Sequence, residues 1–146
     1  MTLSDSFCVD RYRAEFLDLM RTGTVDLVFA NEHELKALYQ TADFETALGL
    51  LRNDCELAAV TLSEKGSIIT RGNETAVIRP VPVERVVDTT GAGDLYASGV
   101  LFGLTQGKSL ADCGKLGSMA ASICISQIGP RPQEDLAEAA RQLGIL

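Results

Sequence analysis

The stretch "VVDTTGAGDLYASGVLFGL", Val86 to Leu104, is the part of the sequence that decides the fold. β-Branched residues lead into a Gly-Ala-Gly turn, and an apolar run with helical character follows directly. A turn without bulky side chains lets a ligand approach the backbone closely. Amide N–H groups at a helix start have no intrahelical partner and lie at the positive end of the helix dipole. The stretch therefore predicts an anion-binding cradle formed by Gly91, Ala92 and Gly93.

A carboxylate, Asp94, stands directly beside this predicted cradle. An aspartate within reach of a hydroxyl can take its proton as the oxygen attacks a phosphorus atom. The cradle amides can meanwhile stabilise the charge that develops on the transferred group. The pattern indicates phosphoryl transfer to an alcohol with Asp94 as the catalytic base. The alternative is that Asp94 is only a first-turn helix residue that suits the dipole.

Outward from this stretch, short apolar runs alternate with amphipathic helical segments, which is typical of an α/β domain with helices on both faces of a mostly parallel sheet. The 46% apolar content and the length of 146 residues predict a single globular domain over residues 1–146. Strands are expected at 25–30 and 57–62, a hairpin over 66–80 turning at Gly72-Asn73, and helices at 9–20, 31–39, 44–53, 92–106, 110–126 and 133–143.

The composition also argues against several classes of protein. The net charge of −7 disfavours a nucleic-acid-binding protein, because such proteins usually carry a basic face. No apolar run reaches the length of a membrane span, and the first residues resemble no signal peptide. The four cysteines contain no C-x-x-C pair, so a zinc site or disulfide framework is not expected. A cytoplasmic protein without nucleic-acid or membrane partners is expected.

The motif "DTTGAGD" at 88–94 is similar to the C-terminal signature of the PfkB (ribokinase-like) family of carbohydrate and nucleoside kinases. Three further segments occur in the order found in that family: "NEHE" at 31–34 resembles its N-x-x-E motif, "VTLSEKGS" at 60–67 resembles its T-x-G-x-x-G nucleotide loop, and "ASICISQIGPRP" at 121–132 resembles the segment near adenine. Ser63 stands where that loop often has a glycine. The combination looks most like a bacterial adenosine-kinase-like subgroup. The resemblance implies a three-layer αβα ribokinase-like fold.

The resemblance also implies a role for individual residues. Asp94 would be the base and Gly91, Ala92 and Gly93 the anion hole, with ATP and Mg²⁺ as cofactors. The remaining expected residues fall into two groups: for the nucleotide and its magnesium Asn31, Glu34, Thr61, Ser63, Gly66 and Ser118, and for a K⁺-like ion Asp88, Thr90 and carbonyls near Cys124, Gln127 and Gly129. For two of these residues an ordinary role stays open. Asp88 suits a turn, and Glu34 suits a solvated helix face.

Kinases of this family are about twice as long, and their N-terminal half carries the acceptor-binding residues and a small lid. None of these features is visible here, so the chain is expected to correspond to a C-terminal, nucleotide-binding half that lacks the N-terminal strands. Three hypotheses follow: a kinase acting on a sugar or nucleoside hydroxyl, a non-catalytic nucleotide-binding or interaction module, and a different phosphate-binding α/β enzyme. We also expect self-association, or a partner that supplies the missing half, because a sheet edge and apolar helix faces would be left exposed.

Overall fold

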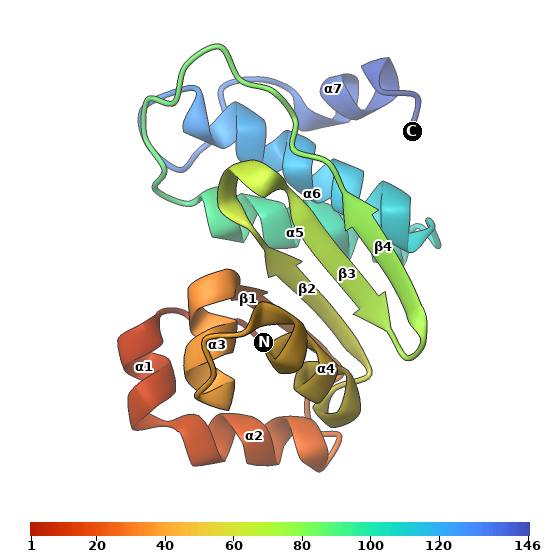
Figure 1. Ribbon diagram of the computed structural model, residues 1–146. Coiled ribbons are helices and arrows are strands. Elements are labelled where there is room, and N and C mark those ends of the chain that lie inside the picture. Colours follow the sequence, from red (N-terminus) through yellow and green to blue (C-terminus); the bar gives the residue numbers. More distant parts are fainter. The chain divides into compact units, whose positions relative to one another are not determined.

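The computed structural model describes all residues from 1 to 146 and shows an α/β chain with one four-stranded sheet in the order β1-β2-β3-β4. The strands are β1 (Leu27–Asn31), β2 (Leu57–Thr61), β3 (Ser67–Arg71) and β4 (Glu74–Ile78) (Figure 1). The chain divides into two compact units, one made of residues 1–63 and 68–75 and the other of residues 64–67 and 76–146. We call them unit 1 and unit 2. The α/β class is confirmed, whereas the single domain stays a prediction.

Unit 1 carries the parallel part of the sheet. β1 and β2 pair in parallel with Leu27 opposite Leu57 and Asn31 opposite Thr61. The first residues of the chain continue the sheet beyond β1, since Thr2 forms a parallel bridge with Phe29. The Phe29 amide donates to the Met1 carbonyl at 2.8 Å, and the Leu3 amide donates to the Phe29 carbonyl at 3.1 Å. β3 and β4 are joined at Gly72 and Asn73, as the sequence predicted.

Four helices of unit 1 share a hydrophobic core with β1 and β2. They are α1 (Ser6–Arg11), α2 (Arg13–Arg21), α3 (Glu32–Tyr39) and α4 (Phe44–Asp54) (Figure 1). Their apolar side chains form a core with Val28, Ala30 and Val60. Burial in β1 alternates between buried and half-buried residues. In β2 the first four residues are all buried.

The helix predicted over residues 9–20 is interrupted. Tyr12 adopts φ −119° and ψ 29°, which ends α1 and begins α2. Asp5 begins α1 earlier than expected, because its side chain accepts a hydrogen bond from the Cys8 amide at 2.7 Å. Apolar spacing is nearly the same for one helix as for two that are joined by a single non-helical residue. The sequence pattern therefore could not reveal the break.

Unit 2 contains three helices, α5 (Ala92–Thr105), α6 (Leu110–Ile125) and α7 (Leu136–Gln142). α5 and α6 lie side by side, and α7 packs against α6 (Figure 1). Glycines line the contact between α5 and α6: a Cβ on Gly99 would lie 2.6 Å from the Leu116 carbonyl oxygen, and one on Gly103 would lie 2.9 Å from the Cys113 Cα. The two helix backbones therefore approach each other more closely than ordinary side chains would permit. None of the chain's helices combines the length and the apolar character that crossing a membrane would require.

Candidate active site

The predicted anion cradle lies at the start of α5 in unit 2. Gly91 is the residue before the helix and has φ 80°, which is the left-handed region that favours glycine. The Ala92 amide donates to the Thr89 carbonyl at 3.2 Å, and the Leu95 amide donates to the Gly91 carbonyl at 2.9 Å. The amides of Gly93 and Asp94 meet no acceptor within the chain. This helix start thus offers free N–H groups in a turn without bulky side chains.

Asp94 is exposed, and no hydrogen bond or ion pair engages its carboxylate. A carboxylate that is held by no protein donor is free to accept a proton from a bound hydroxyl. Its position in the first turn of α5 also keeps it close to the free amides. The structure therefore places the predicted base and part of the predicted anion hole on the same turn, although the Ala92 amide is occupied by Thr89.

The loop before α5 is fixed by Asp88. Its Oδ1 accepts the Thr90 amide and its Oδ2 accepts the Gly129 amide, both at 2.9 Å. These donors, with the Thr90 side chain contributing most, hold the pKa of the Asp88 carboxyl below its usual value. Asp88 therefore connects the cradle loop to residues that lie far along the chain, which is more than the local turn that was the alternative.

A second connection reaches the same loop from α6. The Cys124 thiol donates to the Thr90 carbonyl at 3.3 Å. Four of the five residues expected around a K⁺-like ion thus come together, namely Asp88, Thr90, Cys124 and Gly129. The fifth, Gln127, donates its backbone amide to the Cys124 carbonyl at 3.4 Å, and its side chain bonds to the Arg131 carbonyl and the Gln133 amide. The expected role of its carbonyl stays a prediction. Carbonyl and carboxylate oxygens are the donor atoms that a K⁺-like ion would need here, so the chemistry of these donors fits.

Asn31 and Glu34 form a closed pair at the start of α3 in unit 1. The Asn31 Oδ1 accepts the Glu34 amide at 2.8 Å, while the Glu34 carboxylate accepts the Asn31 amide and the Asn31 Nδ2, each at 2.9 Å. This is a reciprocal capping box. Glu34 is only 6% exposed, and burial raises the pKa of its carboxyl. The solvated helix face that was the alternative for Glu34 is therefore wrong.

The predicted nucleotide loop follows β2. Thr61 ends that strand, and Ser63 adopts φ 54° at the position where a glycine often stands in the family. A left-handed φ is costly for a residue with a Cβ, which explains why glycine suits this position. Gly66, in unit 2, has φ 98°, and a Cβ there would lie 2.0 Å from the Ile78 carbonyl oxygen. Only glycine fits at Gly66.

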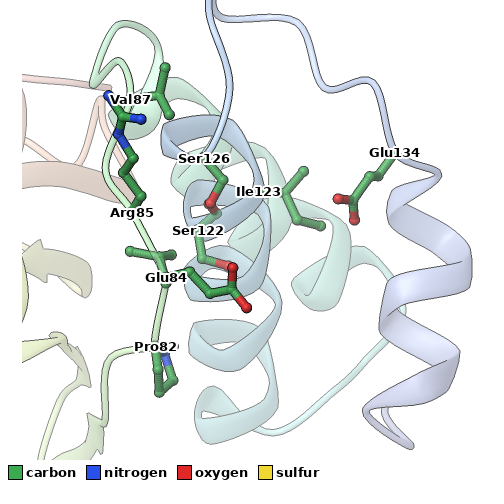
Figure 2. A pocket seen from close by; sticks show the side chains of 9 residues that line it. Pro82, Glu84, Arg85, Val87, Ser122, Ile123, Ser126 and Glu134 are labelled. Atoms are coloured by element: carbon green, nitrogen blue, oxygen red, sulfur yellow. The ribbon is translucent and has the colours of Figure 1, made fainter.

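A cleft of about 400 Å³ opens within unit 2 beside the C-terminal turns of α6. Figure 2 shows Ser122 and Ile123 on α6 and Ser126 directly after it, with Glu134 across from Ile123 and the loop that follows β4 on the other side. Sequence reasoning had expected the segment from Ile123 to lie near adenine, and Ile123 does line the cleft. Ser118 lies on α6 outside the lining. Ser122 and Ser126 belong to the expected segment 121–132, whereas sequence reasoning missed Glu134 and the loop before α5, namely Pro82, Val83, Glu84, Arg85 and Val87. In the sequence, two prolines just after a strand indicated that a loop begins there.

The fold defines an α/β protein, and comparison with known proteins gives its family. The family model for "pfkB family carbohydrate kinase" matches residues 3–136. The chain therefore belongs to the pfkB family of carbohydrate kinases, and the family resemblance of its motifs is confirmed.

Individual relatives support the same assignment. An uncharacterised sugar kinase of Archaeoglobus fulgidus is 37% identical over 102 residues, covering 69% of this chain and 40% of that protein. The crystal structure of a probable sugar kinase from Rhizobium etli matches with a TM-score of 0.98 and 62% identity over 100% of this chain and 44% of that one. Adenosine kinase from Sinorhizobium meliloti matches with a TM-score of 0.96 and 65% identity, over 98% of this chain and 44% of that one. The chain thus spans less than half the length of these relatives, and its ribokinase-like fold is confirmed.

Proposed function

We propose that this chain is the nucleotide-binding portion of a kinase that transfers a phosphoryl group from ATP to a hydroxyl of a nucleoside or sugar. The observation that carries the proposal is the first turn of α5, where the unengaged Asp94 carboxylate lies beside free backbone amides. Asp94 would accept the proton of the attacking hydroxyl, and the amides of the cradle would stabilise the charge on the transferred group. The identities of 65% to an adenosine kinase and 62% to a probable sugar kinase support both acceptor classes.

The nucleotide would extend across several of the residues described above. Within unit 2, we place its adenine in the cleft beside α6 and its phosphates at the cradle of Gly91, Ala92 and Gly93, with Gly66 at the end of the nucleotide loop. For Thr61 and Ser63, which belong to unit 1, a role in nucleotide binding is proposed from the family resemblance alone. Ser118, which lies one turn before Ser122 in α6 and outside the cleft lining, would support the adenine from there. Magnesium would neutralise the phosphate charge when bound, held through water near Asn31 and Glu34. A K⁺-like ion would lie near Asp88, Thr90 and the carbonyls of residues 124–129.

Phosphoryl transfer from Mg·ATP to adenosine, ribose and fructose tests the proposal. The Asp94→Asn variant keeps the size of the side chain and removes the base. We expect the variant to lose turnover by a factor of about 100 or more, because positioned bases contribute roughly that much. Asp10→Asn is the matched control, since Asp10 is an exposed aspartate on α1. Turnover by the unmodified chain that Asp94→Asn retains in full would overturn the role of Asp94.

The second candidate is a nucleotide-binding module without catalysis. The coverage of only 44% of the Rhizobium and Sinorhizobium chains favours it for this polypeptide alone, since the acceptor site would lie in the remainder. Mg·ATP binding by calorimetry, without turnover on any of the three acceptors, would select this candidate. Turnover that Asp94→Asn abolishes would select the kinase. A chain that does not bind Mg·ATP would contradict both.

A further inference from the structure

One buried hydrogen bond in unit 2 connects α5 with the residue that follows the nucleotide loop. The Tyr96 hydroxyl donates to the Ser67 Oγ at 2.8 Å. Tyr96 is 4% exposed and Ser67 is 1% exposed, so neither hydroxyl has water as an alternative partner. Burial raises the pKa of Tyr96 to about 12, and the phenol therefore remains a neutral donor throughout the physiological range.

The two ends of this bond lie next to the residues with proposed roles in binding phosphate. Tyr96 comes two positions after Asp94 on α5, and Ser67 follows Gly66 directly. Gly66 itself cannot shift freely, because its backbone lies so close to the Ile78 carbonyl that a Cβ would be 2.0 Å from that oxygen. A change in the Tyr96–Ser67 distance would therefore move the end of the nucleotide loop relative to the cradle.

α6 fixes Tyr96 from a second direction. A Cβ on Gly117 would lie 2.8 Å from the Tyr96 carbonyl oxygen and 3.0 Å from its ring carbon Cδ2. The tyrosine thus packs directly on the backbone of α6 and has little freedom to rotate. The hydroxyl is held at a defined point, and Ser67 is held by it.

We propose that Tyr96 is a positioning residue, whose hydrogen bond to Ser67 sets the spacing between Gly66 and the cradle so that both contact the same nucleotide. The inference rests on the proposed function, since it requires that the chain bind ATP. A role in stability alone is the competing explanation. The positioning role and the stability role predict different ATP affinities for a variant in which both hydroxyls are removed.

The test compares Tyr96→Phe, Ser67→Ala and the double variant by Mg·ATP calorimetry and by urea unfolding. Each single variant leaves one buried hydroxyl without a partner and lowers the unfolding midpoint. The double variant removes both hydroxyls, so its midpoint returns towards that of the unmodified chain. We expect ATP affinity to fall about three- to tenfold in Tyr96→Phe and to remain reduced in the double variant. The rate of amide hydrogen exchange at residues 64–68 should rise in both Tyr96→Phe and the double variant.

Tyr39→Phe is the matched control. It removes another tyrosine hydroxyl that is bonded within the chain, since Tyr39 donates to Asp54 at 3.0 Å in unit 1. This control should lower the unfolding midpoint without changing ATP affinity. ATP affinity that is unchanged in Tyr96→Phe, or that recovers with stability in the double variant, would overturn the positioning role while leaving the proposed function intact. An unmodified chain that does not bind ATP would overturn the proposed function and this inference with it.

Discussion

At the scale of single residues, Gly91 meets two separate constraints at the cradle. Its φ of 80° is unfavourable for any residue with a Cβ, and a Cβ there would lie 2.4 Å from the Pro130 Cβ. Gly91→Ala should therefore lower the free energy of unfolding by more than the roughly 1–2 kcal/mol typical of a left-handed backbone alone. It should also weaken Mg·ATP binding, because Pro130 and the segment that follows it would have to move away from the cradle.

Gly107 provides the control for this substitution. It has φ 65°, yet nothing lies within 4 Å of the position its Cβ would take. Gly107→Ala should incur only the cost of the backbone conformation and leave ATP binding unchanged. Urea unfolding and calorimetry of the two variants separate the two contributions. Equal losses of stability in both would show that the contact with Pro130 has no energetic consequence.

The lowered pKa of the Asp88 carboxyl leads to a prediction about how stability depends on pH. Its pKa is lowered below the usual 3.8 by hydrogen bonds from Thr90, with the Gly129 amide adding to the effect. A carboxyl whose pKa is lower in the folded state adds stability above about pH 4, and this contribution is lost as the pH falls through its folded pKa. The difference in unfolding free energy between the unmodified chain and Asp88→Asn should therefore shrink from pH 5 to pH 3. Urea titrations at several pH values measure it, and a difference that is constant over this range would contradict the prediction.

The sequence was most informative about residues whose role depends on local backbone. Gly91 and Asp94 could be placed at a helix start because small residues, an aspartate and an apolar run occur in a fixed order. Glu34 could not be placed as buried, because its burial depends on helices and strands that the local pattern does not describe. Whether Asp94 acts as a base remains a prediction for the experiments above.

At the scale of elements, the contact between α5 and α6 depends on glycine. A Cβ on Gly99 would lie 2.7 Å from the Gly117 amide nitrogen, which belongs to a helix backbone and cannot move out of the way easily. Gly99→Ala should thus destabilise unit 2, although alanine is the better helix former. Gly49 in α4 is the matched control, since nothing lies within 4 Å of its Cβ position.

The two variants should change stability in opposite directions. Gly49→Ala should raise the free energy of unfolding by up to about 1 kcal/mol, which is the difference in helix propensity. Gly99→Ala should lower it by about 1–3 kcal/mol, which is typical of overpacking in a dense core. Thermal or urea unfolding measures whether each variant gains or loses stability. A stabilised Gly99→Ala chain would mean that α5 and α6 can separate at little cost.

Element boundaries were predictable where a capping residue marks them. Ser109 starts α6 through its bond to the Asp112 amide at 3.1 Å, and Asn31 starts α3 in the same way. α7 begins at Leu136, after Asp135, which is later than the predicted residue 133, because Asp135 accepts the amides of Ala137 and Glu138. The cleft beside α6 was only partly foreseen, since loop residues carry no periodic signal.

At the scale of the whole molecule, the chain corresponds to 44% of the Rhizobium and Sinorhizobium kinases. Leu101 and Phe102 on α5 are 46% and 43% exposed, which is high for large apolar residues on a helix of this composition. We expect the chain to self-associate through such surfaces, or to bind a polypeptide equivalent to the remainder of its relatives.

Size-exclusion chromatography at micromolar concentration checks this expectation. The unmodified chain should elute above its mass of 15.6 kDa. A chain with Leu101→Gln and Phe102→Gln should shift towards the monomer, whereas Leu50→Gln, at an exposed leucine of α4, serves as the control. A monomeric elution for the unmodified chain would contradict the prediction. The sequence identified the family from one specific motif and three further segments in the family's order, but the division into two units follows from contacts that no motif encodes.

The contact of Cys124 with the loop before α5 gives the protein a built-in chemical reporter. All four cysteines are free, and the Cys124 thiol is fully buried against the Thr90 carbonyl. Its reaction with a thiol reagent must wait for the loop to open, and burial further slows it by raising the pKa of Cys124. With Cys8, Cys55 and Cys113 replaced by serine or alanine, the rate at which Cys124 is labelled would report how often the loop opens. A nucleotide bound at the cradle should then make the remaining cysteine react more slowly, without any fluorescent group attached.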